Sequence, residues 1–229
     1  MWRSEFPRLY ALYESSDRSH PTNYFTNVFA GHLAHWPSET RMSFGPLEKA
    51  LQLLDEAAWQ HVMNECLRFV APKGRDWTPL FNLLYEAFGY EWLTKNGYTR
   101  ITFIERSDKK AKKTPELLGK SQTSSALLEV KTINTSKKAN ERRKKWPSEC
   151  FKLGEPLPDG FERKFTIDVE YARKQLLSYD EPVDRRIILV VIMPDIEFWL
   201  DQAVNREIDE LAASLSTSGF EVIPYQLVR

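Results

Sequence analysis

Residues 127–131 read Leu-Leu-Glu-Val-Lys, an apolar run that ends in two oppositely charged side chains. Side chains of a β-strand alternate between its faces, so Leu128 and Val130 point to one side and Glu129 and Lys131 to the other. A carboxylate and an amine side by side on an apolar strand have two explanations. They form an ion pair on a solvated face, or they belong to a metal site with a catalytic lysine.

A second acid precedes this strand at a spacing that allows a hairpin. Pro115-Glu116 lies upstream, and twelve residues separate Glu116 from Glu129. That length holds a turn and a return strand, which would place the two carboxylates beside each other. Two further acid-x-Lys triplets occur, at 108–110 in a charged loop and at 162–164 in a long insertion over 133–165. Only the triplet at 129–131 ends an apolar strand.

Periodicity and turn formers predict an α/β layered order of elements around this strand. The run at 186–193 is the most apolar and is the expected central strand. The predicted helices are 79–96, 167–179 and 196–215, and the predicted strands are 98–105, 115–119, 126–132, 186–193 and 220–224.

The first 70 residues are expected to be mostly helical. Gly45-Pro46 precedes apolar residues at helical spacing, which predicts one amphipathic helix from Leu47 to about Phe69. A breaker cluster at 71–74 then predicts a boundary between a helical N-terminal extension, residues 1–72, and an α/β domain, residues 73–229.

Composition excludes several classes of protein. The 229 residues are 42% hydrophobic and 13% aromatic, which excludes disorder of the whole chain. No window approaches the ~18 apolar residues of a membrane helix, and the N-terminus opens no apolar signal segment. Two cysteines suit neither a disulfide scaffold nor a four-cysteine zinc site. We therefore expect a cytoplasmic protein without a membrane partner.

Charge is distributed unevenly along the chain. The formal net charge is zero, but residues 100–150 hold 14 basic and 6 acidic side chains, a local charge of +8. A local field steers polyanions more than a total charge does. The sequence therefore favours a polyanionic partner such as nucleic acid.

Pro115-Glu116 followed by Glu129-Val130-Lys131 resembles the PD-(D/E)XK nuclease superfamily, and the similarity extends over roughly residues 78–224. The resemblance implies a restriction-endonuclease-like core of order αβββαβ, with a mixed central sheet flanked by helices. Here that α/β core would follow the mostly helical N-terminal extension. One departure is Glu116, which stands where the superfamily usually has aspartate.

Three further residues match the same pattern. Glu86 matches an acid on the helix before the first strand, and it is preferred over Glu91 because it shares a helix face with Tyr90 and Leu93. Gln175 and Tyr179 match the Gln-x-x-x-Tyr element of the RecB-like branch, although 44 residues separate Lys131 from Gln175.

The resemblance implies a Mg²⁺-dependent deoxyribonuclease that accepts Mn²⁺ as a substitute, with endo- and exonucleolytic action both open. Glu116, Glu129 and the Val130 carbonyl would hold the metal, together with Glu86. Lys131 would orient or deprotonate the attacking water, or stabilise the pentavalent phosphorus. Gln175 and Tyr179 would position the substrate strand.

Basic side chains flank the proposed site on both sides and would contact phosphates. These residues are Lys109, Lys110, Lys112, Lys113, Lys137, Lys138, Arg142, Arg143, Lys144 and Lys145. A homodimer or larger complex would form through residues 1–70.

Two other interpretations stay open. Glu116 in place of aspartate favours a catalytically inactive nuclease-fold module that binds nucleic acid or a partner protein. The third interpretation is a structural or assembly protein, in which residues 1–70 and the acidic C-terminal part mediate contacts. His32 and His35 have a metal-compatible spacing, but no third ligand lies at helical spacing to complete a site.

Overall fold

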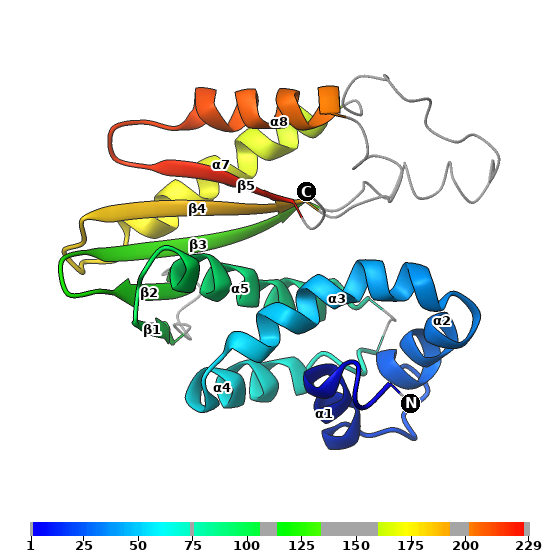
Figure 1. The fold of residues 1–229 in the computed structure, drawn as a ribbon. Helices are drawn as coiled ribbons and strands as arrows, with labels where there is room; N and C mark the ends of the chain where they lie inside the picture. The colour runs from blue at the N-terminus through cyan, green and yellow to red at the C-terminus, as the bar shows by residue number, and fades with distance from the viewer. Residues whose placement is uncertain (1, 74–75, 106–113, 134–159, 193–201, 227–229) are drawn as a thin grey trace. The chain divides into compact units, whose positions relative to one another are not determined.

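The computed structural model describes residues 2–73, 76–105, 114–133, 160–192 and 202–226. Its chain contacts group into two units (Figure 1). Unit 1 comprises residues 1–97 and 101–103, and unit 2 comprises residues 98–100 and 104–229.

Unit 1 is helical, as expected for residues 1–70. Its elements are α1 (Pro7–Ser15), a π-helical segment η1 (Phe25–Phe29), α2 (Ala30–His35), α3 (Pro37–Leu53), α4 (Glu56–Leu67) and α5 (Thr78–Lys95). Its core is rich in aromatic rings, and Phe29 packs edge-on against both Phe6 and Phe44.

The prediction of a single helix from Leu47 to about Phe69 is wrong. The chain forms two helices there, because α3 ends at Leu53 and α4 begins at Glu56. The Asp55 carboxylate caps α4 by accepting a hydrogen bond from the Ala58 amide at 2.8 Å. Apolar spacing continues across this break, so periodicity does not reveal it. Pro46, expected just before the helix, lies inside α3.

Unit 2 holds most of a mixed sheet, and residues 101–103 of its first strand group with unit 1. The strands are β1 (Arg100–Phe103), β2 (Leu117–Lys120), β3 (Ser125–Ile133), β4 (Arg185–Ile192) and β5 (Glu221–Gln226), in the order β1-β2-β3-β4-β5. β2 runs antiparallel to β3, whereas β3, β4 and β5 are parallel. The predicted order of helices and strands from residue 79 onward is confirmed, as is a mixed α/β fold with flanking helices.

Two helices cover one face of this sheet. α7 (Phe161–Leu177) and α8 (Gln202–Leu215) lie on the same side of β3 and β4 (Figure 1). Leu127 and Ile133 of β3 join the apolar core under these helices. Since side chains alternate along a strand, Glu129 and Lys131 share that face with them. The apolar cover of the sheet therefore also covers the candidate site.

By contacts α5 groups with the helices before it, whereas the sequence placed it with the strands that follow. The expected domains 1–72 and 73–229 stay a prediction. Among the described residues, no helix has the length and apolar character needed to span a membrane.

Candidate active site

The hairpin of β2 and β3 places two carboxylates opposite each other. Leu117 pairs with Leu128 in the antiparallel register, so the next position puts Glu116 across from Glu129. Residues directly opposite each other in a strand pair lie on the same face of the sheet. The amide of Val130 donates to Glu116 Oε2 at 3.0 Å, which fixes the Glu116 side chain against β3.

Glu129 is a fully buried carboxylate. Burial raises its pKa well above the ordinary value, and the charge of the neighbouring Glu116 raises it further. Its Oε2 atom is buried and has no hydrogen-bond partner among the described residues. Two carboxylates held this close are stabilised by a proton or by a cation between them.

Lys131 meets Glu129 and Gln175. Its amine forms an ion pair with Glu129 Oε1 and donates to Gln175 Oε1 at 2.7 Å. Burial lowers the pKa of this amine, but Glu129 and then Glu116 raise it more, so the pKa lies above its usual range. The Lys131 side chain is only 19% exposed, so this ion pair does not sit on a solvated face.

Gln175 reaches the site from α7 despite its separation in the chain. Its Nε2 donates to the carbonyl oxygen of Thr114 at 3.3 Å while its Oε1 accepts from Lys131. The side-chain amide of Gln175 thus links Lys131 to Thr114, which lies two residues before Glu116. The sequence singled out Gln175 as a site residue only through the resemblance.

Tyr179 does not share that helix, so the expectation of one helix over 167–179 is wrong at both ends. α7 begins at Phe161 and ends at Leu177, where the Ser178 hydroxyl donates to the Gln175 carbonyl at 2.8 Å. Tyr179 follows the helix and packs against the apolar core of unit 2. The triplet at 162–164 likewise lies in the first turn of α7 rather than in an insertion.

The remaining predicted site residues belong to unit 1 or lie outside the described residues. Glu86 lies in α5 of unit 1 and is 5% exposed, and Glu91 on the same helix pairs with Lys95 at 2.7 Å. The predicted phosphate contacts Lys109, Lys110, Lys112, Lys113, Lys137, Lys138, Arg142, Arg143, Lys144 and Lys145 lie outside the described residues. Their roles, and that of Glu86 toward a metal, stay predictions.

The donor set suits a hard divalent cation. Carboxylate and carbonyl oxygens are the ligands that Mg²⁺ takes in proteins, often one or two carboxylates with several waters. Glu116, Glu129 and the Val130 carbonyl offer that chemistry, and the unpartnered Glu129 Oε2 fits a bound cation. In the described part of the chain, no group of three or more His, Cys, Asp or Glu is arranged to hold a metal ion.

Sequence reasoning missed Asp168. Its charge contributes to the raised pKa of Lys131, and its carboxylate pairs with Lys164 one turn earlier on α7. Asp168 and Gln175 are seven residues apart, and two turns of helix bring such residues to the same face. That spacing is a signal the sequence contained.

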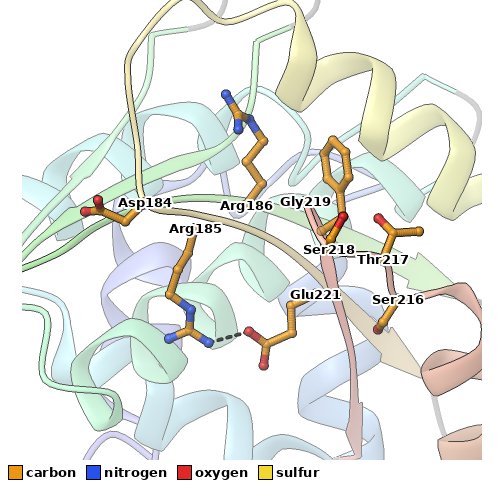
Figure 2. A pocket seen from close by; sticks show the side chains of 9 residues that line it. Asp184, Arg185, Arg186, Ser216, Thr217, Ser218, Gly219 and Glu221 are labelled. Atoms are coloured by element: carbon orange, nitrogen blue, oxygen red, sulfur yellow. Dashed lines mark hydrogen bonds and ion pairs between the residues drawn. The ribbon is translucent and has the colours of Figure 1, made fainter.

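A pocket of about 450 Å³ opens at another place in unit 2, between the start of β4 and the turn before β5 (Figure 2). Its charged residues are largely satisfied by the protein, since Arg185 pairs with Glu221 and Asp184 accepts from the Ser125 amide at 2.7 Å. None of the predicted site residues lines this pocket. The candidate active site is therefore a buried cluster outside this pocket.

Comparisons with known proteins give little further guidance. Neither a family model nor a curated protein matches this chain. Among solved structures, a chain of Pyrococcus furiosus SfsA in complex with Ca²⁺ is similar at 13% identity, with a TM-score of 0.26 over 64% of this chain and 55% of that chain. This chain thus matches little more than half of that protein, and so low a TM-score does not establish a shared fold.

Proposed function

We propose that this chain is a metal-dependent nuclease with a restriction-endonuclease-like core, which hydrolyses phosphodiester bonds in DNA. One observation carries the proposal. The buried Glu129 carboxylate meets both the Glu116 carboxyl and the Lys131 amine. Two acids that can hold a metal ion and an amine that can stabilise negative charge are groups suited to hydrolysis of a phosphodiester.

In this mechanism Glu116, Glu129 and the Val130 carbonyl would hold Mg²⁺ or Mn²⁺. When bound, the ion would supply positive charge beside the phosphate and lower the pKa of a water. In the hydrolysis a water oxygen forms a bond to phosphorus and its proton passes to solvent, the bond from phosphorus to the leaving oxygen breaks, and the leaving oxygen takes up a proton.

The protein's own groups set the geometry of this step. The Lys131 amine, held by Gln175 at 2.7 Å, orients the water or stabilises the charge that develops on the phosphate. Gln175 in turn is fixed by the Thr114 carbonyl, so it acts as a positioning residue. Burial of Glu129 limits water at the acids, which strengthens each electrostatic contact there.

A cleavage assay tests the proposal. Purified protein is incubated with plasmid and with linear DNA in Mg²⁺, in Mn²⁺ or in EDTA. We expect cleavage that needs the metal and that falls at least about 100-fold in Lys131→Ala. The matched control is Lys120→Ala, which removes an amine on β2 that pairs with Glu181 at 2.8 Å and leaves cleavage unchanged. Absence of cleavage with either metal, or full activity in Lys131→Ala, would contradict the proposal.

A non-cutting module that binds nucleic acid or a partner protein is the second candidate. It is favoured by Glu116, which stands where the superfamily usually has aspartate and is one methylene longer. Metal-dependent thermal stability separates the two. The nuclease gains melting temperature in Mn²⁺ and loses that gain in Glu129→Gln, whereas the module is indifferent to Mn²⁺ and still retains DNA at low salt.

A further inference from the structure

α7 exposes three large apolar side chains, and two of them, Ile167 and Tyr171, lie together on one face. Tyr171 is 56% exposed and Ile167 is 43% exposed. They are four residues apart, which makes them neighbours on the helix surface. The opposite side of α7 is buried in the core through Phe165, Val169, Ala172 and Leu176. The exposed pair therefore does not belong to the packing that holds α7 on the sheet.

Positive charge surrounds this pair. Lys174 places its amine 5.6 Å from the centroid of the Tyr171 ring. Helical geometry puts Arg163 on the same side, one turn before Ile167. The acids that adjoin this face are already paired, Asp168 with Lys164 and Glu170 with Arg173. The net charge of the surface formed by Arg163, Ile167, Tyr171 and Lys174 is thus positive.

The same surface lies beside the residue that contacts Lys131. Tyr171 precedes Gln175 by four residues, which is one turn and about 40° around the helix. Gln175 Oε1 accepts from the Lys131 amine at 2.7 Å. A strand lying along this face of α7 would therefore pass Tyr171 and then the side chain of Gln175, which contacts the amine.

We infer that the surface of Arg163, Ile167, Tyr171 and Lys174 binds single-stranded nucleic acid and guides it to Lys131. This inference rests on the proposed function and adds the substrate class. An exposed ring stacks on the face of a base, and within a duplex those faces are covered by neighbouring base pairs. Aromatic rings interleaved with cations are typical of surfaces that track a single strand.

The test measures binding in EDTA, so that it does not depend on cleavage. Fluorescence anisotropy follows a labelled oligothymidylate and a blunt duplex of equal length at low salt. We expect Tyr171→Ala to weaken single-strand binding about tenfold and Tyr171→Phe to stay within about twofold of the original protein, because a phenyl ring still stacks. Duplex binding should be unchanged in both variants.

Leu177→Ala is the matched control, because Leu177 is 62% exposed on the same helix but lies well around it from Tyr171. This control is expected to bind the single strand like the original protein. Circular dichroism of each variant checks that α7 is intact. An equal loss in Tyr171→Ala and Leu177→Ala would mean a general effect on the helix and would overturn the inference.

The remaining outcomes separate this inference from the proposed function. Unchanged single-strand binding in Tyr171→Ala overturns the inference even if the protein cuts DNA. An equal loss for single strand and duplex overturns it too, because it points to backbone contact without stacking. Tyr171-dependent binding by a protein that never cleaves supports the inference while the proposed nuclease activity fails.

Discussion

Two buried glutamates, Glu48 and Glu129, differ in how many hydrogen-bond partners their carboxylates have. Glu48 accepts hydrogen bonds from the amides of Arg8 and Leu9 at 2.9 and 3.1 Å and from Gln52 Nε2 at 2.9 Å. It thereby satisfies the first turn of α1, where amides have no helical partner. Glu129 has one ion pair, an unpartnered oxygen and a second carboxyl beside it. Glu48 thus has a structural role, whereas Glu129 keeps a buried oxygen without a partner among the described residues, as the proposed metal site requires.

The pH dependence of stability tests the role of Glu48. Burial raises the pKa of Glu48, so the folded state holds its proton more tightly than the unfolded state. Its contribution to stability is full below the unfolded pKa of about 4.5 and is lost as pH rises through the folded pKa. Glu48→Gln has no such loss, but it offers one acceptor oxygen to two amides, a cost of about 1–3 kcal/mol.

We therefore expect the stability deficit of Glu48→Gln to be larger at pH 4 than at pH 7. Urea unfolding at both pH values measures it. Glu39→Gln, which changes an acid in the first turn of α3, serves as the control for a general charge effect. Equal deficits at the two pH values would show that burial of Glu48 does not shift its titration.

At the scale of elements, α7 has three sides with three functions. One side packs on the sheet, one carries Gln175 and Asp168 toward Lys131, and one is exposed with Tyr171. The sequence predicted the helix but not its first turn, since Gly160 and the charged triplet suggested a loop. Gly160 instead adopts a left-handed φ of 83° immediately before the helix, a conformation that glycine adopts without steric cost.

The break between α3 and α4 leads to a prediction about Asp55. Asp55→Ala removes the carboxylate that accepts from the Ala58 amide at 2.8 Å, and this should lower the free energy of unfolding by about 1 kcal/mol. Asp55→Asn should recover most of the loss, because an amide oxygen also caps a helix. Urea unfolding at neutral pH is the measurement. If Asp55→Ala were as stable as the original chain, the cap would not be what holds the start of α4.

For the whole molecule, the uneven charge predicts how nucleic-acid binding responds to salt. Residues 100–150 carry a charge of +8 in a chain of zero net charge. Binding should weaken as salt rises, with a log–log slope of about −0.7 for each single-strand phosphate contacted. Glutamine in place of the six basic residues should flatten that slope; these are Lys137, Lys138, Arg142, Arg143, Lys144 and Lys145.

The matched control replaces Lys49 and Arg68, which lie in the acidic first part of the chain. Oligonucleotide anisotropy titrations between low and moderate salt give the slopes. An unchanged slope after the six substitutions would place the phosphate contacts elsewhere on the protein.

The pattern of apolar residues and turn formers predicted the order of elements. The spacing of the two acids also predicted that Glu116 lies beside Glu129, because the length of a hairpin constrains which residues of its strands pair. Pattern did not predict how deeply Glu129 is buried, since depth depends on α7, whose first residue follows Ile133 by 28 positions. It also missed Asp168 and the break at Asp55. Both depend on which atoms a polar side chain contacts in space, a property that apolar periodicity does not record.

The order in which the site's parts occur along the chain has a consequence for biosynthesis. Glu116, Glu129 and Lys131 all emerge from the ribosome within one hairpin, whereas Gln175 and the helix that carries it are synthesised later. During translation the nascent chain therefore holds both acids before their cover exists. Burial of Glu129 therefore has to wait until α7 has been synthesised.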